Sequence, residues 1–192
     1  MIGWLEQLDK FMYINVKNLS KKFNNYVAVN NINFTLDKNM TLGLLGPNGC
    51  GKTTSIGMML GLISPTSGEV LINNKNINKF GREDLLSKMN FASPYIELPK
   101  KLSVRQNLEV YGRLYGVRNL KDRISEISED LDLNDFLDKK TGELSSGQKN
   151  RVTLAKSLIN KPEVLFLDEP TASLDPDIGD FVRNYIEAYK VK

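Results

Sequence analysis

The sequence predicts an α/β fold of the P-loop type, with a mostly parallel core sheet, an N-terminal antiparallel β part and a helical insertion. Three observations lead to this prediction. Residues 41–45 form an apolar run that passes through a glycine-rich turn into a helix start. A second apolar run, Val164–Leu167, ends in two adjacent acids, and residues of about 95–140 show helical spacing between the two runs. Strands that alternate with helical segments in this way are typical of parallel sheets.

Composition sets modest limits on function. A chain of 192 residues with 41% hydrophobic residues suits one domain with a real core. The net charge of +3 is small and the basic residues are interspersed with 23 acids, so no nucleic-acid partner is expected. The single cysteine, Cys50, excludes an internal disulfide and favours a reducing cytosolic compartment. The longest uncharged stretch, 53–68, contains Ser, Thr, Gly and Pro and does not indicate a membrane-spanning helix.

The N-terminal part predicts two paired strands. Residues 1–11 have a weak helical pattern, which fits either a short leader helix or a misassigned start ahead of Met12. Residues 13–16 and 32–36 alternate in polarity and are expected to form strands with one buried face, paired antiparallel. The residues between them, 21–29, are expected to form a loop that carries Phe23 and Tyr26.

The glycine-rich turn fits G-x-x-x-x-G-K-[ST] at every specified position. Gly46, Gly49 and Gly51 have no β-carbon, so the backbone can curl tightly and point successive N–H groups at phosphate oxygens. The helix that follows adds the positive end of its dipole. We expect Lys52 to reach the β- and γ-phosphates and the Thr53 hydroxyl to bind Mg²⁺.

Further elements follow in order. Pro65 and Gly68 interrupt the chain before a strand expected at 69–72, and 85–91 leads into another short apolar segment. Ser103 and Gln106 have the spacing of a capping box and predict a helix start. Apolar residues at helical spacing predict the next helix: Leu120, Ile124, Ile127 and Leu131.

A second serine-capped helix start precedes the acidic strand. Ser145 and Gln148 again fit a capping box, so this helix start is either a second anion site or an ordinary cap. Two neighbouring acids at the end of a buried strand are costly without a cation or hydrogen-bond donors. We expect Asp168 to hold Mg²⁺ through water and Glu169 to orient and deprotonate an attacking water. Alternation along the strand would point them in different directions.

Taken together, the motifs resemble the nucleotide-binding subunits of ABC transporters. The resemblance rests on G-P-N-G-C-G-K-T-T, L-S-S-G-Q, V-L-F-L-D-E-P and A-S-L-D in this order, and extends over 12–192. It implies that two subunits pair head to tail, as a homodimer or heterodimer, with ATP between the P-loop of one and residues 145–148 of the other. It also implies separate membrane permease subunits and a peripheral location on the cytoplasmic face of the membrane.

The resemblance assigns roles to individual residues. Phe23 matches the aromatic residue that stacks on adenine, with Tyr26 as the alternative, and both also fit plain core or surface aromatics. Lys52 and Glu169 are the implied catalytic residues, and Thr53 and Asp168 are the implied Mg²⁺ ligands. Asp175 matches a residue that communicates between the two sites and equally fits a helix cap. The implied ATP-binding residues are Phe23, Gly46, Asn48, Gly49, Cys50, Gly51, Lys52, Thr53, Thr54, Ser145, Gly147 and Gln148.

The sequence departs from the family pattern in two places. The family's Mg²⁺-binding glutamine should follow Phe91, but the chain reads F-A-S-P-Y, so Ser93 or Tyr95 would have to supply a hydroxyl. The apolar side of the last helix, from Pro176 on, needs a sheet, yet no further strand and no switch histidine follow. We therefore expect an incomplete C-terminus, with the last core strand missing, and poor solubility for this chain alone. Two alternatives to an active transporter ATPase stay open: an ATP-binding module with little hydrolysis, and a non-transport ABC ATPase.

Overall fold

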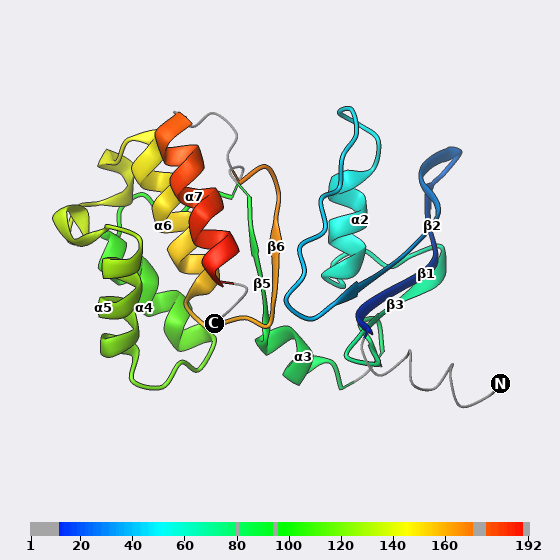
Figure 1. Cartoon of the computed structure of the whole chain (residues 1–192), viewed down its shortest axis with the longest axis horizontal. Coiled ribbons are helices and arrows are strands. Elements are labelled where there is room, and N and C mark those ends of the chain that lie inside the picture. The colour runs from blue at the N-terminus through cyan, green and yellow to red at the C-terminus, as the bar shows by residue number, and fades with distance from the viewer. Residues whose placement is uncertain (1–11, 80, 94–95, 171–175, 190–192) are drawn as a thin grey trace. The chain divides into compact units, whose positions relative to one another are not determined.

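A computed structural model describes residues 12–79, 81–93, 96–170 and 176–189 (Figure 1). The contacts divide the chain into two units, Met1–Leu86 and Ser87–Lys192, and each is described by itself. Within the described residues, no helix combines the length and the apolar character needed to cross a bilayer. The leader at 1–11, Tyr95 and Asp175 lie outside the described residues.

The first unit contains an antiparallel sheet with the strand order β2-β1-β3-β4. Its strands are β1 (Met12–Phe23), β2 (Tyr26–Asp37), β3 (Ser67–Ile72) and β4 (Lys75–Asn76). The register runs from Met12 opposite Asp37 to Phe23 opposite Tyr26, which confirms the predicted antiparallel pairing.

The predicted loop at 21–29 is wrong, because the two strands continue to within two residues of each other. A tight turn joins them, and Asn24 adopts a φ of 50° in it. Asparagine tolerates this left-handed conformation better than most residues, which explains how so short a hairpin turn forms without glycine.

The predicted strand at 41–45 is also wrong. These residues have no regular secondary structure, and the side chain of Leu45 is 95% exposed. A strand requires a neighbour that accepts and donates its backbone hydrogen bonds, and none of the described strands pairs with this segment. The helix predicted after the glycine-rich turn is present as α2 (Lys52–Met59), which buries Ile56, Met58 and Met59.

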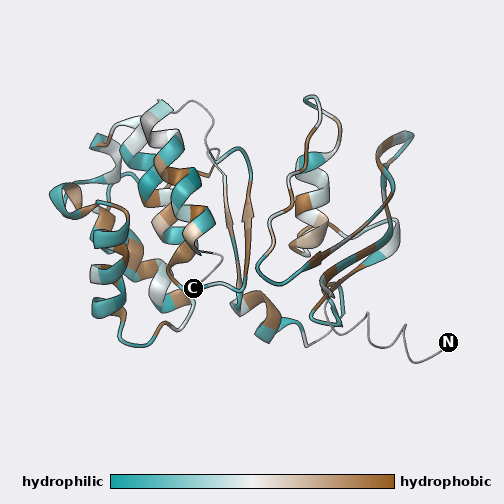
Figure 2. Ribbon diagram, viewed as in Figure 1, coloured by the Kyte–Doolittle hydropathy of each residue, from teal (hydrophilic) through white to brown (hydrophobic). Residues whose placement is uncertain are grey.

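The second unit has a parallel pair of strands beside a group of helices. Strands β5 (Met89–Ala92) and β6 (Val164–Leu167) pair in register, with Ala92 opposite Leu167. Both are hydrophobic along most of their length (Figure 2), as expected for strands of a buried parallel sheet. Residues 85–91, which were expected to lead into a short apolar segment, include the end of the short helix α3 (Glu83–Ser87) and most of β5.

The predicted helices of this unit are all present. They are α4 (Val104–Leu114), α5 (Leu120–Asp130), α6 (Ser146–Leu158) and α7 (Pro176–Tyr189), with two short 3₁₀ helices, η1 (Asn134–Phe136) and η2 (Thr141–Glu143). One hydrophobic cluster joins them, and Leu108, Ile127 and Leu158 are fully buried in it. The apolar side of α7 packs against this cluster together with Leu165 and Leu167 of β6. Val182 is buried in this cluster, and Phe181, Tyr185, Ile186 and Tyr189 pack against it but stay partly exposed.

Candidate functional site

The glycine-rich loop has the backbone geometry that its sequence predicts. Gly49 and Gly51 have φ values of 81° and 95°, and Gly46 has a φ of 155°, all in the region that favours glycine. A β-carbon at Gly51 would lie 2.3 Å from the carbonyl oxygen of Ala28 in β2. Glycine at 51 is therefore required both by its own conformation and by the close approach of the loop to the sheet.

Helix α2 begins without a side-chain cap. Its N-cap is Gly51, no side chain accepts a hydrogen bond from its first turn, and the first turn contains no acid. The first N–H groups of a helix have no partner inside the helix, and the positive end of the helix dipole lies at the same place. The start of α2 can therefore bind an anion, and it lies in the glycine-rich motif from which this site was predicted.

The Lys52 ammonium lies over the same loop. Its Nζ donates hydrogen bonds to the carbonyl oxygens of Gly46, at 2.6 Å, and Pro47, at 3.0 Å. The sulfur of Cys50 lies 4.0 Å from this Nζ. The loop thus folds around a positive charge, and a phosphate could take over donors that now bind the loop's own carbonyls.

Two exposed aromatic residues lie at the turn of the β1–β2 hairpin in the same unit. Phe23 and Tyr26 are opposite each other, with exposed fractions of 47% and 60%. The Lys21 ammonium lies 5.0 Å from the ring centroid of Phe23. The Tyr26 hydroxyl donates a hydrogen bond to the Gly49 carbonyl at 3.3 Å, a link between hairpin and loop that the sequence did not indicate.

In the second unit, the two acids come directly after β6. The Asp168 N–H donates to the Ala92 carbonyl at 2.9 Å, so the parallel ladder continues one residue beyond the strands. The Asp168 side chain is 8% exposed, and its carboxylate makes no hydrogen bond or ion pair with the described residues. A buried carboxylate of this kind calls for a cation or water.

Glu169 differs from its neighbour in backbone conformation. It is exposed and has a φ of 50°, a left-handed conformation that is uncommon for a residue with a long side chain. The two acids differ in burial, and the chain turns at 169; the expectation from strand alternation that they point in different directions stays a prediction. Residues held in such conformations cluster at functional sites.

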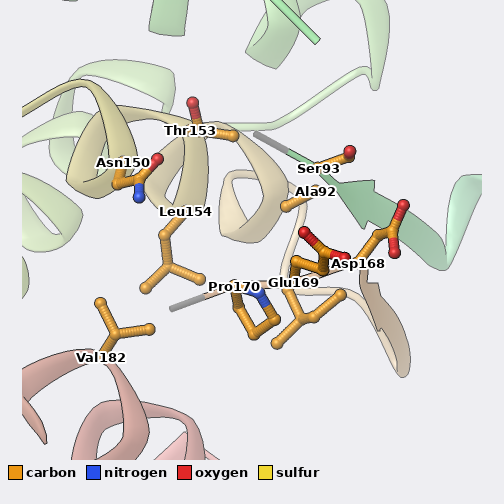
Figure 3. Close-up of a pocket in the computed structure, with 10 residues that line it drawn as sticks. Ala92, Ser93, Asn150, Thr153, Leu154, Asp168, Glu169, Pro170 and Val182 are labelled. Carbon is orange, nitrogen blue, oxygen red and sulfur yellow. The ribbon is translucent and has the colours of Figure 1, made fainter. Parts of the chain in front are cut away.

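Ser93 lies next to these acids. It follows β5 in register with Asp168 and is 4% exposed. Ser93, Asp168 and Glu169 line a cavity of about 20 Å³, and Figure 3 shows their side chains together where the two strands end. Ser93 and Tyr95 were the two hydroxyls considered in place of the family's glutamine. Ser93, the one that the structure describes, lies beside the two acids at the end of the strands.

The predicted capping box at Ser145 is present. Ser145 Oγ accepts a hydrogen bond from the Gln148 N–H at 3.2 Å, and Gln148 Oε1 accepts one from the Ser145 N–H at 3.0 Å. Two of the first N–H groups of α6 are thus satisfied inside the chain. The N–H groups of Ser146 and Gly147 have no such partner among the described residues.

The other end of α6 is held by Arg123, whose role the sequence did not indicate. This side chain is 7% exposed and donates to the carbonyls of Leu158, at 2.5 Å, and Ile159, at 3.2 Å. It also pairs with Glu126 at 2.9 Å. The hydrogen bond from Arg123 holds the pKa of the Glu126 carboxyl below its usual value.

The metal ligands predicted from the sequence fall in both units. Thr53 belongs to the first unit and Asp168 to the second. Among the described residues, no group of three or more Cys, Asp or Glu side chains forms a metal cluster.

Comparisons with known proteins agree with these motifs. Residues 29–172 match the family described as ABC transporter. The chain is 38% identical over 165 residues to the Nod factor export ATP-binding protein I of Burkholderia lata, and the match covers 85% of this chain and 54% of that protein. It is 42% identical over 162 residues to the zinc import ATP-binding protein ZnuC of Rickettsia bellii, covering 84% of this chain and 64% of that protein. The chain therefore spans between half and two thirds of the length of these relatives.

A solved structure extends the comparison to the fold. The ATP-binding cassette MJ0796, in a dimeric post-hydrolysis state bound to ADP and Pi, superposes with a TM-score of 0.81 at 26% identity. The match covers 92% of this chain and 82% of that one. The similarity confirms the predicted P-loop α/β fold, including its antiparallel part and its helices. With a family match over most of its residues, the chain belongs to the ABC transporter family.

Proposed function

We propose that this chain is an ATP-binding subunit of an ABC transporter that binds and hydrolyses MgATP at a head-to-tail dimer interface. The observation that carries the proposal is the phosphate loop itself. Its glycines adopt the required conformations, Lys52 lies over it, and α2 starts without a cap. These features together provide backbone donors and a positive charge for a triphosphate.

The residues around the loop would bind the rest of the nucleotide. Asn48, Cys50, Thr53 and Thr54 lie in or directly after the loop, where their backbone or side chains can reach phosphate oxygens. Phe23, exposed at the end of the hairpin, would stack on adenine. The Lys21 ammonium already lies over the Phe23 ring and is attracted to its electron-rich face. A stacked adenine would join this existing cation–π contact.

The acidic end of β6 would supply the metal site and the base. Thr53 and Asp168 would hold Mg²⁺, with the Ser93 hydroxyl beside Asp168 taking the place of the missing glutamine. When bound, Mg²⁺ neutralises charge on the phosphate oxygens. Glu169, exposed at the turn, would orient the attacking water and accept its proton.

A second copy or a related subunit would complete the site. Ser145, Gly147 and Gln148 start α6, whose remaining N–H groups could bind the γ-phosphate held by the partner. The dimeric state of MJ0796 with ADP and Pi supports this arrangement. Because the relatives are named for export and import, we propose that separate permease subunits form the transport pathway and that this chain binds them at the cytoplasmic face of the membrane.

A binding module with little hydrolysis is the second candidate. It is favoured by one observation, the serine found where the family has a Mg²⁺-binding glutamine. The Ser93→Ala and Ser93→Thr variants test whether this hydroxyl compensates. We expect Ser93→Ala to weaken the binding of Mn²⁺ to the nucleotide complex about 10- to 100-fold and Ser93→Thr to keep it. Equal Mn²⁺ affinity in both variants would remove Ser93 from the metal site.

Binding and turnover measured on one sample test the main proposal. Isothermal titration should show MgATP binding to the chain, strong loss of binding in Lys52→Ala, and retained binding in Glu169→Gln. Phosphate release should be lost in both variants. Binding without release in the unchanged protein would favour the second candidate, and absence of ATP binding would refute both.

A further inference from the structure

We propose that strand β2 braces the phosphate loop and that the Tyr26 hydroxyl is the positioning contact of this brace. This inference rests on the proposed function, because it assigns a role in nucleotide binding. It gives Tyr26 a task different from adenine stacking. The task is to fix the shape of the loop from the side of the sheet.

The brace consists of two contacts between alternate residues of each segment. The Tyr26 hydroxyl donates to the Gly49 carbonyl at 3.3 Å, and the Ala28 carbonyl oxygen approaches Gly51 so closely that a β-carbon there would lie only 2.3 Å from it. The first contact is made by a side chain of β2 and the second by its backbone, two residues further along the strand. Gly49 and Gly51 flank Cys50 and directly precede Lys52. The brace therefore acts on the turn that aims the loop amides.

The two contacts differ in how they can be changed. The contact at Gly51 is between backbone groups and holds only while residue 51 is glycine. The contact at Gly49 depends on one phenolic oxygen, because a β-carbon on Gly49 would meet nothing within 4 Å. Without the Tyr26 hydroxyl, this side of the loop would lose its hydrogen bond to the sheet. Tyr26→Phe removes that oxygen and keeps the ring.

The same end of the hairpin carries both Tyr26 and Phe23, the residue proposed to stack on adenine. Phe23 lies opposite Tyr26 in the ladder, and the backbone near Phe23 is tied down by Lys22, whose N–H donates to Thr66 Oγ1 at 3.0 Å. Lys21 Nζ donates to the Ser64 carbonyl at 2.8 Å. Tyr26 therefore extends from an anchored hairpin to the loop, while the Lys21 ammonium lies over one face of the Phe23 ring.

Two ligands separate a brace from a base-stacking residue. Magnesium tripolyphosphate has the phosphates of ATP but no adenine. We expect Tyr26→Phe to weaken ATP and tripolyphosphate equally, about two- to tenfold, as one hydrogen bond requires. We expect Phe23→Ala to weaken ATP by more and to leave tripolyphosphate unchanged. Isothermal titration of the full chain and both variants gives the four affinities.

A second measurement tests the brace without any ligand. Hydrogen exchange of the loop amides at 48–51 should be about two- to tenfold faster in Tyr26→Phe than in the unchanged chain, and equal in Phe23→Ala. Unchanged exchange and unchanged tripolyphosphate affinity in Tyr26→Phe would overturn the inference. Weaker ATP binding with unchanged tripolyphosphate binding would also overturn it and make Tyr26 a stacking residue. If the unchanged chain bound neither ligand, the proposed function would fail, and the exchange rates would still decide whether the brace exists.

Discussion

Helices α2 and α6 both have a small residue at the N-cap, but α6 has a side-chain cap and α2 has none. Helix α2 begins at Gly51 with no side-chain cap and with Lys52 folded over the loop before it. Helix α6 begins with the reciprocal bonds of Ser145 and Gln148, and Arg123 binds the carbonyls at its other end. One helix leaves its donors available, and the other is fixed at both ends by its own chain.

This difference separates two tasks that similar sequences can perform. An open helix start can rearrange around a ligand, because its donors have no competing partner. A capped helix keeps its orientation, and the N–H groups of Ser146 and Gly147, which have no partner in the part of the chain that the structure describes, remain for an outside anion. We infer that α2 binds the phosphates and that α6 serves mainly as a rigid surface presented to a second subunit.

Substitution of the loop glycines should have the largest effect on the open end. In Gly51→Ala, the new methyl group would meet the Ala28 carbonyl and the residue would keep an unfavourable φ, so we expect ATP affinity to fall by at least about 100-fold. Gly49→Ala is the matched control, because it has a similar φ and open space around it. It should lower the free energy of unfolding by only about 1 kcal/mol. Titration calorimetry gives the ATP affinity of both variants, and thermal unfolding gives their free energies of unfolding. An equal loss of ATP affinity in Gly49→Ala and Gly51→Ala would contradict the brace at Gly51.

Removal of the Arg123 side chain should be the next largest change. Arg123→Met removes the side-chain donor of both carbonyls; Leu158 keeps the bond from the Lys161 N–H, whereas Ile159 loses its donor, so we expect the free energy of unfolding to fall by about 1 to 3 kcal/mol. Lys161→Ala removes the exposed partner of Glu126 and should change it by less than about 1 kcal/mol. Chemical denaturation measures both. A larger loss in Lys161→Ala would show that the surface pair, not the helix end, matters.

The capping boxes of α4 and α6 allow a direct test of function against stability. Ser103→Ala and Ser145→Ala break the same type of cap, so each should lower the free energy of unfolding by about 0.5 to 2 kcal/mol. Only Ser145→Ala should also reduce ATP turnover, since of the helices α4 and α6 only α6 is proposed to meet the nucleotide. Turnover that falls equally in both variants would mean that Ser145 acts through stability alone.

The smallest expected effect is a pH dependence at the fixed end of α6. The pKa of Glu126 is below its usual value of 4.5 in the folded chain, mainly because of the hydrogen bond from Arg123. Its contribution is therefore complete above pH 4.5 and is lost as the pH falls through the folded pKa. The side chain is 47% exposed, so screening limits the contribution to a few tenths of a kcal/mol, about what exposed pairs give.

Glu126→Gln should flatten the pH dependence of stability below pH 4.5. Glu129→Gln on the same helix is the control and should leave it unchanged. Denaturant titrations between neutral pH and the start of acid unfolding measure both. A steeper loss of stability in Glu126→Gln than in the unchanged chain would contradict the sign of the shift.

Features that depend on neighbours in sequence were predicted well. The capping boxes at Ser103 and Ser145 and the helix at Pro176–Tyr189 follow from spacings of a few residues, and the structure has them where they were expected. The segment at 41–45 was predicted as a strand because it is apolar, but strand formation also needs a partner that its own sequence does not specify.

Contacts between distant residues were not predicted. The bond from Tyr26 to Gly49 joins residues 23 apart in sequence, and that from Arg123 to Ile159 joins residues 36 apart. Both bonds end on backbone carbonyls, which every residue has, so no side-chain pattern indicates the partner. The phosphate-binding chemistry of the loop could be predicted from the sequence. The contacts that position the loop could not.

The left-handed backbone at Glu169 has a consequence for laboratory evolution. Glycine or asparagine would fit this conformation with about 1 kcal/mol less strain, and neither could accept a proton from water. The chain thus gives up some folding stability at this position and gains a carboxylate there. Because we propose Glu169 as the base, we expect a screen for heat resistance alone to favour its replacement and to select stable proteins that bind ATP without hydrolysing it.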